Sequence, residues 1–187
     1  MSIVTLDDAK KQINIPADAT EFDDEVQAYC DGITAVIEDY KREVIEPRTI
    51  REDIEHAGRS GRCFRLWSVP VISLTSLTSV TGSTVWDVSP TVLRVNSNTG
   101  LVRVLSGPAV RGLAEAVYQA GYQTIPDNYR RGALVALQHN WETRRGAAGG
   151  GVRNGVVGPE EVYDPRWSYS IPRKALEWLG APRPVVG

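Results

Sequence analysis

Histidine and cysteine are the residues whose chemistry deserves testing first, and each occurs twice in this chain. His56 falls in an expected strand and His139 in an expected helix, and neither has Cys, Asp or Glu at the spacing of a zinc or iron site. Cys30 and Cys63 show neither metal-ligand spacing nor a disulfide framework. We therefore expect no metal and no cofactor, and we expect both cysteines to be small buried side chains in a reducing compartment.

Carboxylates cluster at positions 23–25, where they could serve acid–base chemistry. They stand at the start of an expected helix, where the helix dipole favours anions, and this accounts for them without a catalytic role. The segment GRSGR at 58–62 lacks the second glycine of a nucleophile elbow. We expect no catalytic residues and no enzyme.

Glycines gather at 146–158, but a phosphate-binding loop is not indicated. A helix rather than a strand precedes them, and no Lys-Ser or Lys-Thr pair follows. Without periodicity, the segment predicts a mobile loop.

Four helices are predicted from apolar residues at helical spacing. The first follows Thr5, a capping residue with Asp8 three positions later. The third follows Pro126 and carries a stripe of Leu134, Leu137 and Trp141, which we expect to pack in the core. The expected ranges are 6–15, 22–42, 127–145 and 172–179.

The longest helical stripe lies in the second expected helix. It predicts one buried face made of Val26, Tyr29, Ile33, Val36, Ile37 and Tyr40.

Between the second and third helices the pattern changes to alternation, which predicts short strands. Turn signals separate them, among them the glycines of 58–61, and short turns favour antiparallel pairing. The expected strands are 49–56, 63–67, 73–80, 84–88, 92–95, 101–105 and 114–120. The predicted fold class is α+β, mainly an α-helical bundle with an inserted antiparallel β subdomain.

The predicted organisation is one structural domain, since 187 residues suffice for a single sizeable core. We assign helices of the core to 1–46, the inserted β segment to 47–122, the long core helix to 123–146, and a Gly-rich loop, short helix and extended tail to 147–187. No stretch resembles a signal peptide or a membrane span.

Charge is distributed unevenly behind a net charge of -2. Residues 1–46 hold 4 basic and 12 acidic side chains, 47–126 hold 8 and 5, and 127–187 hold 9 and 6. A solvated acidic face explains the first segment in a monomer, whereas in a ring it could face a neighbour's basic surface.

Several segments together resemble one family. They are TLDDAKKQINI, FDDEVQAYCDGITAVIEDYKR, LWSVPVISLTSLTSV, and AGY followed by IPDNYRRGALVALQHNWETR and IPRKALEWLG. Their order is similar to that of the head-tail connector, or adaptor, proteins of tailed bacteriophages. The resemblance covers most of the chain and rests on the conjunction of its parts.

The resemblance implies a structural protein of the virion neck, assembled in the host cytoplasm. It implies a homo-oligomeric ring, with a dodecamer as the expected form, that binds the portal protein and a tail-side stopper or tail protein. Double-stranded DNA would pass through its channel with at most weak contact. No membrane partner is expected.

Two groups of residues are candidates for those contacts. For the portal interface they are Trp167, Tyr169, Trp178 and Arg183, with aromatic anchors and an arginine as polar partner. For contacts between subunits or with DNA they are Arg144, Arg145 and Arg153, although helix capping and loop solvation explain these arginines equally well.

Other readings stay open at this level. A stopper or tail terminator should be richer in strands and lack the two opening helices. A DNA-binding adaptor should offer a basic recognition helix, but the helix over 127–145 spends its centre on apolar residues.

Overall fold

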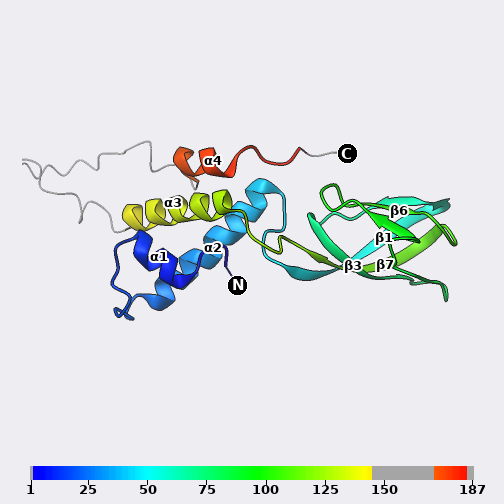
Figure 1. Cartoon of the computed structure of the whole chain (residues 1–187), viewed down its shortest axis with the longest axis horizontal. Coiled ribbons are helices and arrows are strands. Elements are labelled where there is room, and N and C mark those ends of the chain that lie inside the picture. The colour runs from blue at the N-terminus through cyan, green and yellow to red at the C-terminus, as the bar shows by residue number, and fades with distance from the viewer. Residues whose placement is uncertain (1, 145–170, 185–187) are drawn as a thin grey trace, which may run out of the picture. The chain divides into compact units, whose positions relative to one another are not determined.

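The computed structural model describes residues 2–144 and 171–184. The chain divides into two compact units, a helical unit formed by Met1–Lys41 and Ile125–Gly187 and a β unit formed by Arg42–Thr124. The predicted α+β class, with antiparallel sheets inserted between helices, is confirmed (Figure 1).

Described residues of the helical unit form four helices. Apolar spacing and end signals locate them well, because Thr5 caps the first by accepting a hydrogen bond from the Asp8 N–H at 3.2 Å. The helices are α1 (Leu6–Gln12), α2 (Asp23–Lys41), α3 (Asp127–Arg144) and α4 (Arg173–Leu179).

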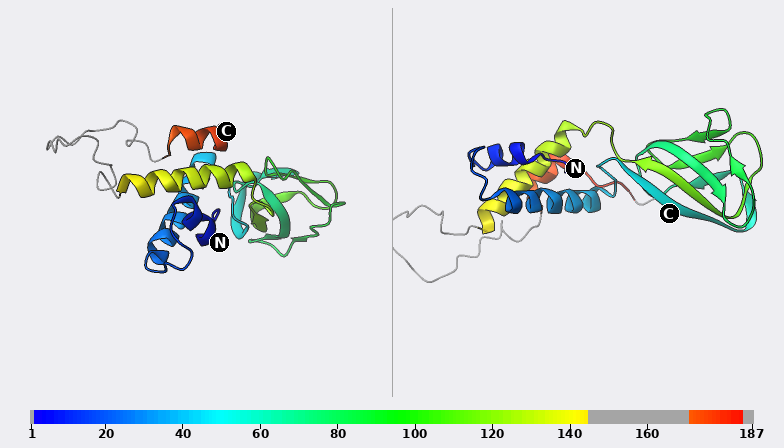
Figure 2. Two further views of the ribbon diagram at one scale, coloured as in Figure 1. Left: turned by 60° about the vertical axis from the view of Figure 1, so that its left-hand side comes forward. Right: turned by 90° about the horizontal axis from the view of Figure 1, so that it is seen from below.

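Helix α3 is the centre of this unit. It packs against α1, α2 and α4, and α4 lies on the side of α3 away from α1 (Figure 2). Trp141 is buried and meets the rings of Phe22 and Tyr29 edge-on, at centroid distances of 6.1 and 6.0 Å. The Gln12 amide donates to the Gln138 side-chain oxygen at 2.6 Å, which ties α1 to α3.

The predicted helical stripes need two corrections. Val36 is 40% exposed, because the buried face of α2 passes through Cys30, Ile33 and Ile37 and leaves Val36 at its margin. In α3, Leu137 and Trp141 are buried whereas Leu134 is only half-buried. The small residues Gly132, Ala133 and Ala136 hold the more buried positions, since they let neighbouring helices approach closely.

Two antiparallel sheets form the β unit. Their strand orders are β1-β7-β3-β4 and β2-β6-β5. The strands are β1 (Arg48–Gly61), β2 (Cys63–Arg65), β3 (Val71–Ser79), β4 (Val85–Trp86), β5 (Leu93–Val95), β6 (Leu101–Val104) and β7 (Val110–Ala120).

One apolar core joins both sheets. Tyr118 and Leu77 come from the four-stranded sheet and Leu66 and Val102 from the region of the three-stranded sheet, all fully buried. Gly100 has φ +69° and turns the chain into β6, where a Cβ would approach the Leu66 carbonyl oxygen to 2.2 Å.

Two expectations for the β unit are wrong. The glycines of 58–61 form no turn, because β1 continues to Gly61 and absorbs the irregularity as a register shift against β7 between His56 and Ser60. Cys63 is exposed rather than buried, since the alternation of β2 places Phe64 inward instead.

Candidate functional site

Residues considered for metal or acid–base chemistry do not converge in the described part of the chain. No group of three or more His, Cys, Asp or Glu side chains there could hold a metal ion. Asp23 forms an ion pair with the buried Lys10, so that carboxylate has a structural partner. His139 is half-buried in α3, and His56 belongs to β1.

Burial perturbs one cysteine without making it reactive. Desolvation, with a smaller contribution from the charge of Asp31, raises the pKa of the Cys30 thiol to about 11. A thiol with a raised pKa carries little thiolate near neutral pH, so Cys30 behaves as a small apolar core residue.

Two exposed tryptophans are the most conspicuous features of the surface. Trp67 is 76% exposed and Trp178 is 46% exposed, although indole rings normally bury most of their area. Exposed aromatic side chains on ordered segments are typical anchors for protein partners. We therefore treat the two segments that hold these residues as two separate candidate sites, one in each unit.

Lys41, at the end of α2, holds the segment that carries Trp178. Its ammonium group is buried and donates to the Leu179 carbonyl at 2.9 Å and to the Ala181 carbonyl at 2.7 Å. It also lies 5.3 Å from the ring centroid of Tyr129. A cation at the carbonyl end of α4 satisfies acceptors that the helix leaves open.

Further contacts fix the same segment. The Asn128 amide donates to the Trp178 carbonyl at 3.0 Å, and the Tyr40 hydroxyl donates to the Gly180 carbonyl at 3.2 Å. Leu179 is buried over Gly132, where a Cβ would come within 2.8 Å of the leucine side chain. The backbone that carries Trp178 is therefore fixed while its ring stays accessible.

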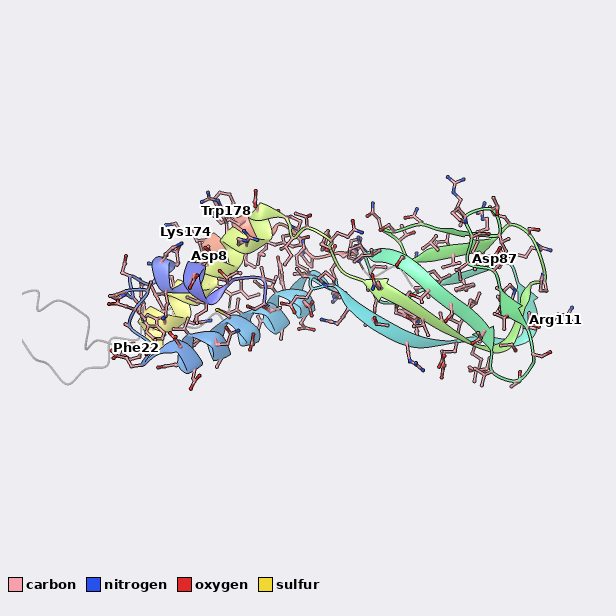
Figure 3. All side chains as sticks on the ribbon, turned by 60° about the horizontal axis from the view of Figure 1, so that its bottom comes forward. Asp8, Phe22, Asp87, Arg111, Lys174 and Trp178 are labelled. Atoms are coloured by element: carbon pink, nitrogen blue, oxygen red, sulfur yellow. The ribbon has the colours of Figure 1, made fainter. Side chains whose placement is uncertain are left out.

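Among the described residues, one cationic side chain lies over the ring of Trp178. The Arg131 guanidinium carbon lies 5.7 Å from the ring centroid. Trp178 and Lys174, one helical turn apart on α4, are both exposed (Figure 3). This end of the helical unit presents an aromatic ring among cations.

A partly buried hydrogen-bond network of the β unit holds the backbone at Trp67. The Trp67 N–H donates to both carboxylate oxygens of Glu52 at 3.1 Å, and the Ser68 N–H donates to the Tyr118 hydroxyl at 3.1 Å. The Tyr118 hydroxyl in turn donates to Glu52 at 2.5 Å. Burial, followed by this bond to Glu52, raises the pKa of Tyr118 to about 12, so the hydroxyl stays protonated.

The sequence prediction identified only part of these sites. Trp178 and Arg183 belong to the segment held by Lys41, and Arg183 donates its backbone N–H to the Lys41 carbonyl at 3.2 Å. Trp167, Tyr169, Arg145 and Arg153 lie outside the described residues, as does the side chain of Arg144. Trp67, Lys41 and the Glu52–Tyr118 pair were missed; the one available signal was a tryptophan standing between β2 and a Val-Pro pair.

No helix in the described part of the chain has the length and apolar character needed to cross a bilayer.

Comparisons with known proteins find solved structures with a similar fold. No protein-family model matches the chain, and no curated protein matches its sequence. A chain in the neck of an empty GTA particle, computed with C6 symmetry, superposes with a TM-score of 0.62 at 15% identity, covering 97% of this chain and 91% of that one.

Two further structures give similar results. A chain from the virion of a native gene transfer agent (GTA) particle has a TM-score of 0.60 at 17% identity, with 97% of this chain and 91% of that one covered. A chain in the neck of the native particle, computed with C12 symmetry, has a TM-score of 0.55 at 18% identity, with 86% and 83% covered. The protein therefore has the fold of a chain found in the necks of gene transfer agent particles.

Proposed function

We propose that this protein is a structural component of the neck of a phage-like particle, and within the neck a head-tail connector. In this role it forms a ring beneath the portal, joins the capsid to a tail-side stopper or tail protein, and leaves a channel for DNA. The observation that carries the proposal is the likeness to a neck chain and to a virion chain of GTA particles, over nearly the whole length of this chain and of theirs. A likeness confined to one unit would have supported only a shared module.

The two opening helices favour the connector over other neck proteins. A stopper or tail terminator should be richer in strands and should lack them, whereas α1 and α2 stand at the start of this chain and pack on α3. A ring of identical subunits needs a rigid body with two different side faces. The helical unit, with α3 held on three sides by other helices, supplies such a body.

The portal contact is assigned to the segment from α4 to Arg183. Trp178 provides an exposed aromatic anchor beside Arg131, and Arg183 lies close behind it in the chain. Trp167 and Tyr169 remain predicted members of the same interface. Lys41 prepares this segment for binding, because a partner then meets a backbone that is already ordered.

Contact with DNA is a smaller part of the proposal. Arg144, Arg145 and Arg153 remain predicted contacts with a neighbouring subunit or with passing DNA. A sequence-specific DNA-binding adaptor is disfavoured, because α3 buries Ala133, Leu137 and Trp141 in its own unit. We expect any binding of duplex DNA to be weak and to disappear with added salt.

Native mass spectrometry of the full chain, alone and with the portal protein of the same genome, tests this function. A closed ring, formed alone or on the portal, is expected, and Trp178→Ala should weaken portal binding more than about tenfold while leaving the fold intact. Val80→Ala, at an apolar position of the β unit that is 54% exposed, is the matched control and should bind normally.

A monomer that ignores the portal would refute the connector role. A point variant is preferable to removing residues 165–187, because α4 buries Ala175 and Leu179 and covers Lys41, so the deletion would also unfold part of the helical unit.

A further inference from the structure

The outer face of the three-stranded sheet has the composition of an interface. Alternation turns Phe64, Leu93, Val102 and Val104 inward, where all four are buried. The opposite face carries Arg65, Arg94, Leu101, Arg103 and the thiol of Cys63. None of the three strands contains an acidic residue. We call this surface, with Trp67 just beyond the end of β2, the Arg-Trp face.

Two arginines of this face repel each other. Arg94 on β5 stands directly opposite Arg103 on β6, and both are exposed. Within residues 2–144 and 171–184 neither guanidinium has an ion-pair partner. Like charges directly opposite on neighbouring strands destabilise a sheet, so an acidic partner from outside would relieve an existing cost. Both arginines line an open hollow of about 360 Å³, which gives an acidic side chain room to enter.

Trp67 adds an apolar anchor at the same place. The Leu66 N–H donates to the Gly100 carbonyl at 2.9 Å, which continues the ladder between β2 and β6 one residue beyond Arg65. The next residue is Trp67, whose N–H is bound by Glu52. Tryptophan and arginine are the side chains most enriched at energetic centres of interfaces. This combination fits an acidic protein surface with an apolar groove better than it fits nucleic acid, because Leu101 offers no hydrogen-bond donor to a phosphate backbone and Trp67 offers only one.

The chain itself carries a surface of that kind on α2. Asp24, Asp31 and Asp39 are exposed and, at helical spacing, share one side with Ala28 and Ala35. Small residues between the carboxylates let a partner approach closely.

An apolar groove adjoins this row of aspartates. Its volume is about 240 Å³, and its lining includes Ala28, Gly32, Val36 and Tyr29. A Cβ placed on Gly32 would meet no atom within 4 Å, so the groove is open at its centre.

We propose that the Arg-Trp face of one copy binds the acidic groove face of α2 in a second copy, with Arg94 and Arg103 paired to aspartates and Trp67 seated in the groove. The two faces differ and lie on one chain, so repeating the contact builds a head-to-tail array, and such an array closes into a ring where the rotation between subunits allows it. This inference rests on the proposed ring assembly and names the surfaces that would close it.

Charge reversal on the full chain tests the contact. Arg94→Glu with Arg103→Glu should raise the concentration needed for ring assembly, measured by native mass spectrometry with and without the portal, by more than about tenfold. Adding Asp31→Arg and Asp39→Arg to that variant should restore assembly. The control is Arg111→Glu with Arg130→Glu, two exposed arginines that belong to neither face, and it should assemble normally. Figure 3 labels Arg111, which lies at one end of the β unit.

A second variant blocks the groove without harming the fold. Gly32→Leu replaces an exposed helical glycine and should stabilise α2 while it fills the groove, so assembly should fail in a protein that melts at or above the wild-type temperature. Trp67→Ala should also assemble poorly, with unchanged melting.

The possible results distinguish failure of the proposed contact from failure of the proposed ring. A wild-type ring that persists in Arg94→Glu/Arg103→Glu and in Gly32→Leu overturns the proposed contact and leaves the connector role standing. A wild-type protein that forms no ring under any condition overturns both. If the arginine variant assembles normally but loses binding to a 30-base-pair duplex, the face serves nucleic acid and the inference is wrong.

Discussion

The two units of the chain hold their exposed tryptophans by opposite means. In the helical unit a buried cation, Lys41, binds the backbone carbonyls that follow Trp178. In the β unit the half-buried carboxylate of Glu52 and the buried phenol of Tyr118 bind the backbone N–H groups of Trp67 and Ser68. In both units a polar side chain binds the main chain beside the tryptophan, and the indole ring stays accessible.

The difference lies in what the local secondary structure leaves unsatisfied. The last carbonyl groups of a helix have no hydrogen-bond partner within the helix. The end of α4 therefore needs a hydrogen-bond donor, and the ammonium group of Lys41 supplies several N–H donors. Backbone N–H groups lose their strand partner where the chain leaves a sheet. The N–H groups of Trp67 and Ser68, after β2, therefore need a hydrogen-bond acceptor. The backbone beside each exposed tryptophan thus depends on a charged side chain of opposite sign, the buried Lys41 in the helical unit and the half-buried Glu52 in the β unit.

The strongest test of this comparison asks whether the units are stabilised separately. Leu137→Ala in α3 and Leu77→Ala in β3 remove fully buried side chains, and each should lower the free energy of unfolding of its own unit by about 2–5 kcal/mol. Hydrogen exchange followed by mass spectrometry should show lost protection in the mutated unit alone. Equal loss in both units would mean that they unfold as one, and the comparison would fail.

Replacing the buried cation tests the helical side. Lys41→Met keeps the apolar stem but leaves the carbonyls of Leu179 and Ala181 without their donor, and we expect a loss of about 1.5–3 kcal/mol. Limited proteolysis should then cut near α4. Lys11→Met, at an exposed position of α1, is the control and should behave as wild type.

The matching change in the β unit is Tyr118→Phe. It removes the hydroxyl that connects Ser68 to Glu52 and should cost about 1–3 kcal/mol, because the partly buried Ser68 N–H and Glu52 carboxylate lose a hydrogen-bond partner. Tryptophan fluorescence of Trp67 should broaden or shift while α4 keeps its protection from exchange. A Tyr118→Phe protein with wild-type stability and fluorescence would show that the network does not hold Trp67.

The smallest predicted effect is a difference between the two units in how their stability falls at alkaline pH. Burial raises the pKa of Cys30 from 9.0 to about 11 and that of Tyr118 from 10.0 to about 12, so the folded state holds both protons more tightly than the unfolded state. Stability from these groups is complete below the unfolded pKa and falls as pH rises, between about 9 and 11 in the helical unit and between 10 and 12 in the β unit.

Methyl NMR of each unit during denaturant titrations at several pH values measures these slopes. Cys30→Ala should flatten only the slope of the helical unit and Tyr118→Phe only that of the β unit. A slope that survives its own substitution would assign the pH dependence to another group.

Local patterns made most elements predictable. Thr5 and Pro126 mark helix starts that the structure places within a residue, and alternation located all seven strands. The C-terminal end of β1 was not predictable, because the glycines of 58–61 read as a turn, whereas pairing of Ser60 and Gly61 with β7 continues the strand. The exposure of some apolar residues was also not predictable, since Val36 and Trp67 have the same apolar character and periodic spacing as buried neighbours.

The sequence by itself determined the class of fold, the order of helices and strands, and the uneven charge, because periodicity, capping residues and composition are local properties of the chain. Only the tertiary structure decided that Lys41 meets the carbonyls after Trp178, that Glu52 and Tyr118 meet the N–H groups after β2, and that Arg94 faces Arg103. Those contacts join residues far apart in the chain, and they depend on register and packing that no local pattern encodes.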